Sequence, residues 1–175
     1  MPKVLKILQA PHSILSTPVK PVKKIDKKIK RLVEDMIFTL KHQYDPPGIG
    51  LAANQVGENL SLFILWPDYD KKPEVIINPK ILEKKFKSEL SKTLQLEGCL
   101  SLPKIWGEVK RAEKVLLEYM DEKGNKKTKW FKGLKARIVQ HEVDHLNGIL
   151  FTQRVIQQGG IIYQEKGEGL KKIEL

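Results

Sequence analysis

The residues with the clearest chemical meaning are His141 and His145, which flank Glu142 in a His-Glu-Val-Asp-His segment. Residues four apart on an α-helix project from the same face, so the two histidines can bind one metal ion. The glutamate between them is placed to accept a proton from water, which a metal hydrolase requires and a purely structural metal site does not. The segment therefore favours a catalytic metal centre over the simpler interpretation of a polar helix face.

The residues around this segment predict the helix that must carry it. Gly133 precedes the segment and Asn147-Gly148 follows it, so the helix is expected to start near Leu134 and to end after Leu146. A stripe of side chains at spacings of three and four faces the core and consists of Leu134, Ile138, His141 and His145. Both histidines are therefore expected to point inward.

A catalytic metal site normally has three protein ligands and one position for water or substrate, so a third ligand is needed. Cys99 is the only cysteine of the chain, which excludes an intramolecular disulfide. A lone cysteine is also compatible with a small buried side chain that has no chemical role, and spacing alone does not favour the ligand. Gly98 before it permits close approach of another chain or a ligand.

A third segment, residues 46–57, is rich in glycine and other small residues. Gly48 and Gly50 resemble the start of a phosphate-binding loop, but the rest of that pattern is absent, and an isolated Gly-x-Gly is weak evidence for a nucleotide. The segment therefore indicates a close backbone approach rather than nucleotide binding. Gln55 follows, and its amide can donate a hydrogen bond into a cleft.

Together, the three segments resemble the three motifs of the peptide deformylase family, which are Gly-Φ-Gly-Φ-Ala-Ala-x-Gln, Glu-Gly-Cys-Leu-Ser and Gln-His-Glu-x-Asp-His, where Φ is apolar. They occur in the family order at residues 48–55, 97–101 and 140–145, and the resemblance spans most of the chain. It implies a metal-dependent hydrolase that removes the formyl group from the N-terminal formylmethionine of new polypeptides and releases formate. The roles it implies are metal binding by Cys99, His141 and His145, acid–base catalysis by Glu142, and oxyanion stabilisation by Gln55 and the backbone N–H of Leu100.

The resemblance further implies how the substrate is held. The extended peptide pairs with the backbone around Ile49 and Gly50 as an added strand, which accepts many sequences. An apolar pocket selects the methionine side chain, and its expected members are Ile49, Leu134 and Ile138, with core packing as the alternative for these residues. Glu97, from the second motif, is expected on the substrate side of the site.

Two positions depart from the family pattern near the proposed site. Position 54 is asparagine where many members have proline, and an arginine found after the second motif in some members is replaced by the Ile-Trp-Gly sequence at 105–107. Contacts to the peptide beyond methionine are therefore open. Arg111 is expected to anchor Glu97 or Asp144, with a surface position as the alternative.

The resemblance favours Fe(II) as the native metal ion, with Zn, Ni or Co able to occupy the same ligands, and the ligand set itself also suits zinc. Two other functions remain open. A metallopeptidase of the His-Glu-x-x-His type needs a third ligand downstream, and because no histidine follows His145 that ligand would be Glu165 or Glu168. A basic RNA-binding protein with a structural metal would not need Glu142 or Gln55.

The composition is that of one folded domain, expected over residues 1–175, because 41% of the 175 residues are hydrophobic and the chain has no internal repeat. The sequence has no run of about 18 apolar residues and no signal-peptide pattern, so we expect a cytoplasmic protein without a membrane partner. The 32 basic and 21 acidic residues leave a net charge of +11, which suggests an anionic partner, the ribosome surface for a deformylase. The alternative is a set of solvated lysine-rich faces, and no DNA partner is expected.

The remaining sequence predicts an α+β fold in which antiparallel strands pack around the central metal-binding helix, with a further helix near the N-terminus. The N-terminal helix is expected from an apolar stripe between Ile25 and Leu40, with Asp26 as its cap. From Gln157 onward, the glycine-rich tail predicts a strand or an irregular extension. The predicted strands are residues 60–65, 75–77, 115–119 and 126–131, the last two joined by a turn at 121–125.

Overall fold

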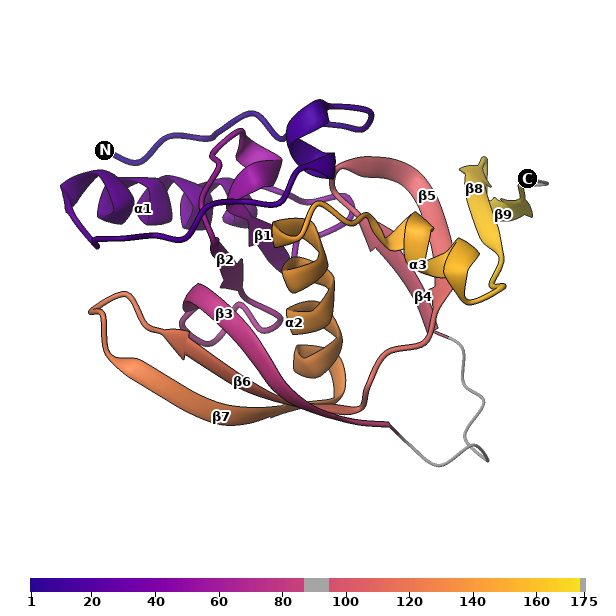
Figure 1. The fold of residues 1–175 in the computed structure, drawn as a ribbon. Helices are drawn as coiled ribbons and strands as arrows, with labels where there is room; N and C mark the ends of the chain where they lie inside the picture. Colours follow the sequence, from indigo (N-terminus) through magenta and orange to yellow (C-terminus); the bar gives the residue numbers. More distant parts are fainter. Residues whose placement is uncertain (87–94, 174–175) are drawn as a thin grey trace.

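The computed structural model describes residues 1–86 and 95–173, which form helices and antiparallel sheets (Figure 1). The helices are α1 (Lys27–Lys41), α2 (Gly133–Leu146) and α3 (Phe151–Gln157), with the 3₁₀ turns η1 (Ser13–Ser16) and η2 (Ala53–Val56). The strands are β1 (Gly50–Ala52), β2 (Leu62–Leu65), β3 (Glu74–Lys85), β4 (Gln95–Cys99), β5 (Leu102–Val109), β6 (Lys114–Met120), β7 (Lys126–Lys132), β8 (Ile162–Lys166) and β9 (Gly169–Lys172). This is the α+β class that the sequence predicts.

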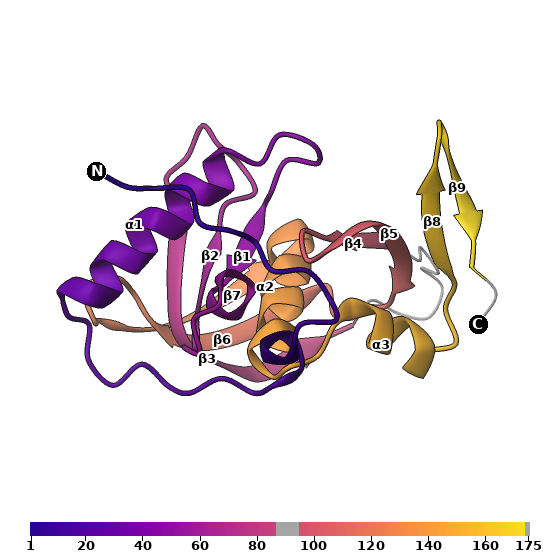
Figure 2. The same cartoon turned by 90° about the horizontal axis from the view of Figure 1, so that it is seen from above.

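Two antiparallel sheets flank helix α2. The first has the strand order β1-β2-β3-β6-β7, and the second has the order β4-β5-β8-β9. In Figures 1 and 2, α2 lies between the sheets, α1 lies on the other side of β1 and β2, and α3 lies beside the second sheet. Arg137 of α2 donates to the carbonyl oxygen of Leu96 in β4 at 3.1 Å, which ties the helix to the second sheet. The edge strands β1 and β4 thus both border α2.

Helix α1 confirms the predicted N-terminal helix. Its first turn is capped by Asp26, whose Oδ1 accepts a hydrogen bond from the N–H of Ile29 at 3.0 Å. Met36 and Leu40 are fully buried and pack in the cluster that also contains Leu51 of β1. Burial of this stripe fixes α1 against the first sheet and so supports the strand that borders α2.

Helix α2 begins and ends within one residue of the predicted bounds, but its inward stripe is only partly as predicted. Ile138 and His145 are buried, whereas Leu134 is 49% exposed because the first turn of the helix borders an open cleft. After the helix, Gly148 has a φ of +71°, and a Cβ there would lie 2.7 Å from backbone atoms of the N-terminal segment. The turn that ends α2 therefore requires glycine.

The four predicted strands correspond to β2, β3, β6 and β7, although β2 begins at Leu62, two residues later than predicted. The turn between β6 and β7 is held by Asp121, whose Oδ1 accepts from the N–H groups of Lys123 and Asn125 at 2.9 Å. Strand β3 runs beyond the predicted residues to Lys85, because its polar second half pairs with β6 across two irregularities in register. The sequence analysis did not predict β1, β4, β5 and α3.

The tail after α3 forms the β8–β9 hairpin, which confirms the predicted strand. β8 pairs with β5, with Trp106 opposite Tyr163, and β9 forms the outer edge of the second sheet. Figure 2 shows the hairpin at the end of the molecule farthest from α1. The tail therefore extends the second sheet instead of packing on the first.

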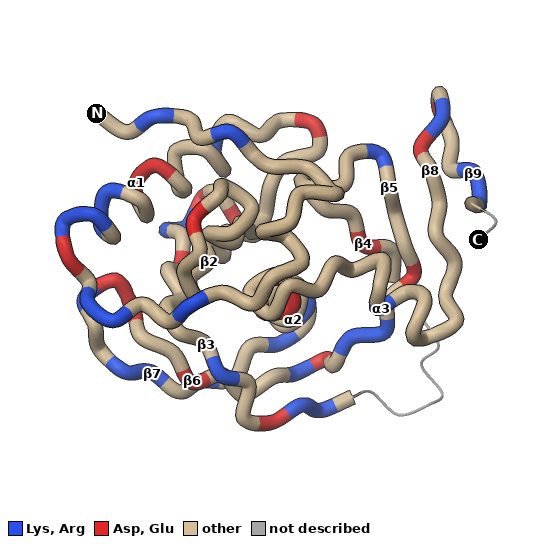
Figure 3. Tube along the Cα trace, turned by 45° about the horizontal axis from the view of Figure 1, so that its top comes forward, with Lys and Arg blue, Asp and Glu red and all other residues tan. Residues whose placement is uncertain are grey.

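Basic residues are spread over several elements. Figure 3 shows lysine and arginine positions along α1, β3, β7 and β9. The sequence is also rich in lysine between residues 80 and 92, and the part of this run from residue 87 onward lies outside the described residues. No helix in the described ranges, 1–86 and 95–173, is long and apolar enough to cross a membrane.

Candidate metal centre

Three side chains from two elements meet at the predicted metal centre. Cys99 is the last residue of β4, and His141 and His145 lie one turn apart on α2. Sγ of Cys99 lies 3.1 Å from Nε2 of His145, and one donor atom from each of the three residues lies within 4.8 Å of the other two. Tetrahedral ligands about 2.0 to 2.3 Å from one ion are separated by about 3.3 to 3.8 Å. One sulfur and two imidazole donors at these distances fit a divalent metal ion.

The charges at the centre also suit metal binding. Burial alone would raise the pKa of the Cys99 thiol, but the imidazoles of His145 and His141 lower it well below its ordinary value. Burial would lower the pKa of His141, but its contacts with Cys99 and Glu97 raise it. The lowered pKa favours the thiolate form of Cys99, which is the form that binds a metal ion.

Glu97 fixes the orientation of His141. Nδ1 of His141 lies 3.1 Å from Oε2 of Glu97, so the other ring nitrogen is directed toward the remaining ligands. Burial would raise the pKa of Glu97, but His141 and Arg111 lower it to about 2, so its carboxylate is ionised. Glu97 lines the cleft, yet both of its oxygens are bound by Arg111 and His141. These contacts position His141, a role that the sequence analysis did not assign to Glu97, and the expected contact of Glu97 with substrate stays a prediction.

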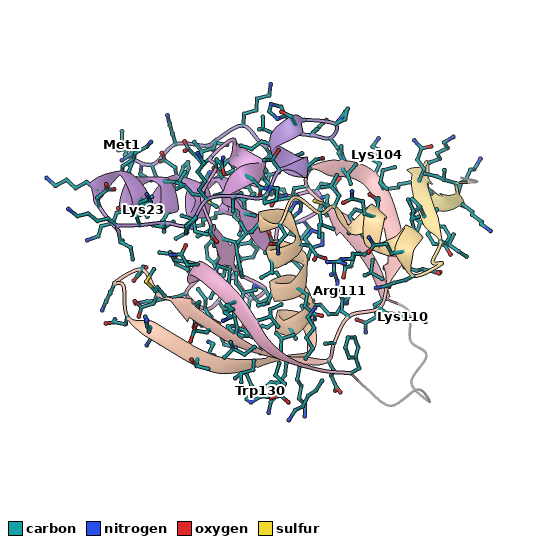
Figure 4. The ribbon with its side chains drawn as sticks, viewed as in Figure 1. Met1, Lys23, Lys104, Lys110, Arg111 and Trp130 are labelled. Atoms are coloured by element: carbon teal, nitrogen blue, oxygen red, sulfur yellow. The ribbon has the colours of Figure 1, made fainter. Side chains whose placement is uncertain are left out.

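Arg111 binds both acidic residues that the sequence analysis named as its candidates. Its Nε and Nη2 donate to Glu97 at 2.8 and 3.0 Å, and its Nη1 donates to Asp144 at 2.5 Å. The side chain is only 7% exposed, so the predicted anchoring is confirmed and the surface alternative is wrong. Figure 4 shows Arg111 between α2 and the second sheet. Arg154 of α3, which the sequence analysis missed, donates to Asp144 at 2.7 and 3.1 Å.

Glu142 lies in the cleft beside the metal centre and is 3% exposed. Burial is the main cause that raises its pKa to about 7. Glycine at position 50 makes room for this side chain, because a Cβ there would lie 2.8 Å from Cγ2 of Ile138 and even closer to Oε1 of Glu142. Oε2 of Glu142 is buried without a hydrogen-bond partner among the described residues. Such a carboxyl group can accept and release a proton near neutral pH.

Gln55 of η2 is 2% exposed and lines the same cleft. Its Oε1 accepts from the N–H of Ala52 at 2.9 Å, which orients the side-chain amide. Its Nε2 then lies 3.1 Å from Oγ of Ser101 and 3.6 Å from Sγ of Cys99. The predicted donor is thus directed at the metal centre, where it also contacts Ser101, to which the sequence analysis assigned no role.

The asparagine at position 54 has a structural use that proline would not provide. Nδ2 of Asn54 donates to the main-chain oxygen of His145 at 2.6 Å, and the side chain is fully buried. This hydrogen bond joins η2, which carries Gln55, to the end of α2. The departure from the family pattern therefore links the two elements that carry the predicted catalytic and metal-binding residues.

The cleft lies between β1, β4 and α2 and collects the predicted substrate residues. Ile49, Gly50, Leu134 and Ile138 line it together with Leu100. The structure thus brings all of the predicted site residues together, since His145 lies in the metal centre behind this cleft. Lining residues that the sequence analysis did not assign are Pro46, Pro47, Gly48, Leu96, Gly98, Trp106 and Arg137.

Comparisons with known proteins agree with this site. The model of a family described as polypeptide deformylase matches residues 4–159. A peptide deformylase of Dictyoglomus turgidum is 43% identical over 155 residues, which cover 89% of this chain and 95% of the relative. The crystal structure of a peptide deformylase from Synechococcus elongatus in complex with actinonin has a TM-score of 0.78 and 39% identity, and covers 86% of this chain and 78% of that chain. A Met-Ala-Ser-bound class I type b peptide deformylase from Acinetobacter baumannii has a TM-score of 0.77 and 35% identity, with coverage of 89% and 100%.

Proposed function

The chain belongs to the polypeptide deformylase family, and on this premise we propose that Cys99, His141 and His145 hold the metal ion of a peptide deformylase. The reaction hydrolyses the amide between the formyl group and the N-terminal methionine of a polypeptide, and releases formate and a free amine. The observation that carries the assignment is Glu142, a buried acid with a raised pKa, beside a cysteine and two histidines that can hold one metal ion.

Glu142 is the proposed acid–base residue. When bound, the metal ion would supply a Lewis acid that lowers the pKa of water toward neutrality. Glu142 accepts a proton from the attacking water and passes it to the departing amine, and a pKa of about 7 suits both transfers near neutral pH. Glu97 holds His141 in one orientation, so that the ligand and the acid on the same helix keep their relative positions.

Two donors are proposed to stabilise the formyl oxygen as it becomes negative. Nε2 of Gln55 is already oriented by the hydrogen bond between its Oε1 and Ala52, so little reorganisation is needed. Leu100 follows Cys99 directly and lines the cleft, which supports its backbone N–H as the second donor. Each such donor contributes roughly 3 to 4 kcal/mol to transition-state stabilisation in comparable sites.

The substrate peptide is proposed to lie between the edge strands β1 and β4. Edge strands present unpaired backbone groups, and an extended peptide can bind them as an added strand. Ile49, Leu134 and Ile138 line the cleft and offer apolar surface for the methionine side chain. The half-exposed position of Leu134 suits this role better than the alternative of core packing. The Acinetobacter baumannii relative was solved with Met-Ala-Ser bound, a peptide of the deformylated kind.

Fe(II) is the proposed native ion on the basis of the family resemblance, with Zn, Ni or Co able to occupy the same three ligands. A thiolate ligand and ferrous iron both favour a reducing compartment, so the cytoplasm is the proposed location. Because the substrate is a newly synthesised chain, the net charge of +11 supports transient contact with the anionic ribosome surface.

The two alternative functions fit the site less well. The metallopeptidase hypothesis required Glu165 or Glu168 as the third ligand, but the donor that lies beside the two histidines is Cys99. Oε2 of Glu165 instead accepts a hydrogen bond from Nε1 of Trp106 at 3.2 Å. A structural metal site has no use for the buried acid Glu142. The donor set and the acid together support a hydrolase.

Formate release from formyl-Met-Ala-Ser tests the proposed function. The protein is purified without oxygen and loaded with Fe(II), and unformylated Met-Ala-Ser serves as the control substrate. We expect one formate for each new amine, and we expect Glu142→Gln to keep the metal and lose turnover, whereas the exposed Glu113→Gln keeps both. Cleavage of a peptide bond, or the absence of formate from fully loaded protein, would show that the assignment is wrong.

A further inference from the structure

The β8–β9 hairpin lies beyond the region matched by the family, which ends at residue 159, yet it is joined to the cleft. β8 pairs with β5, and β5 pairs with β4, the edge strand that borders the cleft. Ile162 at the start of β8 is buried in a cluster with Val109, Phe151 and Val155. The hydroxyl group of Tyr163 donates to Oε1 of Glu108 at 2.8 Å. The base of the hairpin is therefore fixed to the rest of the second sheet.

Trp106 connects this hairpin to the cleft. Its indole ring lines the cleft and packs on Gly98, where an added Cβ would lie 3.0 to 3.2 Å from three ring atoms. At the other end of the ring, Nε1 donates to Oε2 of Glu165 in β8 at 3.2 Å. Gly98 immediately precedes the ligand Cys99, so the indole lies against the strand that carries part of the metal centre. The hairpin thus contacts a large apolar side chain that lines the cleft.

We propose that the β8–β9 hairpin, through Glu165, holds the Trp106 indole as an apolar wall that selects peptides with apolar side chains after methionine. The inference rests on the proposed deformylase function and adds a specificity element to it. An indole ring offers a large contact area, and a ring whose orientation is already fixed loses little conformational entropy when a side chain packs against it. Leu96 and Leu100 line the same cleft and add to its apolar surface.

The experiment compares kcat/KM for formyl-Met-Leu-Leu and formyl-Met-Ser-Ser, and the readout is the ratio between the two peptides. In the wild type we expect a ratio of at least about 5 in favour of the apolar peptide. Glu165→Leu removes the acceptor of the indole N–H and should lower this ratio by about 2- to 5-fold, mainly through KM for the apolar peptide. Glu165→Gln keeps an acceptor oxygen and should restore most of the preference. Glu168→Leu, at an exposed neighbouring position, is the matched control and should leave the ratio unchanged.

A second variant tests whether Glu165 acts through the indole. Trp106→Phe keeps an aromatic ring but has no N–H, so adding Glu165→Leu to it should cause no further change in the ratio. The same ratio in wild type, Glu165→Leu and Trp106→Phe, or an undiminished effect of Glu165→Leu in the phenylalanine background, would overturn the inference. Formyl-methioninamide ends before the proposed wall, so it distinguishes failure of the specificity inference from failure of the proposed deformylase function. If the loaded wild type does not hydrolyse it, the proposed function itself is wrong.

Discussion

Replacing Arg111 by methionine removes a cation shared by two buried carboxylates. Arg111 donates two hydrogen bonds to Glu97 and one to Asp144. Asp144 keeps Arg154 as a partner, whereas Glu97 keeps only His141. Arg111→Met therefore leaves the buried carboxylate of Glu97 with His141 as its remaining partner. The variant should be less stable, and His141 should be held less firmly in its orientation.

The expected loss of stability in Arg111→Met follows from the pKa of Glu97. Burial opposes ionisation, yet His141 and Arg111 together lower the pKa from its ordinary value of 4.5 to about 2. At about 1.4 kcal/mol for each pKa unit, the ionised form contributes about 3 kcal/mol to folding at neutral pH, and Arg111 supplies part of this. Removing one partner from a buried ion pair costs about 3 to 5 kcal/mol in other proteins. We therefore expect Arg111→Met to lower the free energy of unfolding by about 2 to 4 kcal/mol.

The loss of stability in Arg111→Met should be larger at neutral pH than at acidic pH. Because the pKa of Glu97 is lower in the folded state than in the unfolded state, its contribution is fully present above a pH of about 4.5 and is lost as the pH falls toward about 2. Arg111→Met removes part of this contribution. The difference in stability between wild type and variant should therefore be largest near neutral pH and shrink as the pH falls through this window.

Urea unfolding of the metal-free proteins at several pH values measures this difference. Lys127→Met is the control, because it breaks a surface ion pair with Asp121 at 3.6 Å and should change stability by less than about 1 kcal/mol. Adding Glu97→Gln to Arg111→Met removes the stranded charge and should recover part of the loss. A loss no larger than that of the control, or one that is independent of pH, would refute the reasoning.

The remaining predictions concern the cleft. Cys99→Ala should retain far less than one equivalent of metal after dialysis, because it removes the only thiolate of the chain; full retention with normal turnover would exclude the cysteine from the site. Glu142→Gln should keep about one metal per chain while kcat for formate release falls by about 10² to 10⁴, and loss of metal from this variant would contradict the acid–base role. Gln55→Leu should lower kcat by about 10² to 10³, whereas a rise in KM alone would identify a binding residue. Gly50→Ala should lower kcat with metal content unchanged, because the added methyl group displaces Glu142 or Ile138; unchanged kinetics would show that the cleft has more room than the structure indicates.

The features that could be predicted from the sequence depend on residues close together along the chain. Asp26 caps α1 through an N–H three residues later, and the β6–β7 turn is closed by Asp121 within four residues. The spacing of His141 and His145 defines one face of a helix, and that geometry holds wherever the helix packs. Local hydrogen bonds and periodicity therefore suffice for these elements and for two of the three proposed metal ligands.

The roles predicted for Cys99 and Gln55 came from the resemblance of three motifs, in their order along the chain, to those of a family. Nothing in the spacing of Cys99 or Gln55 shows that they lie beside the two histidines. The hydrogen bond between Glu97 and His141 joins residues 44 positions apart, and the bond between Asn54 and His145 joins residues 91 positions apart. Contacts at such separations leave no periodic trace in the sequence.

Only the tertiary structure decided how these groups act on one another. The sequence analysis placed Glu97 on the substrate side of the site, and packing of β4 beside α2 also gives its carboxylate contacts with Arg111 and His141 that no local pattern indicates. Leu134 continues an apolar stripe, yet the open cleft leaves it half exposed. The raised pKa of Glu142 likewise arises from burial, which depends on every element around the cleft. Residue types and local spacing determined which chemistry this chain can perform, whereas the desolvation and long-range pairing that tune it exist only once the two sheets close around α2.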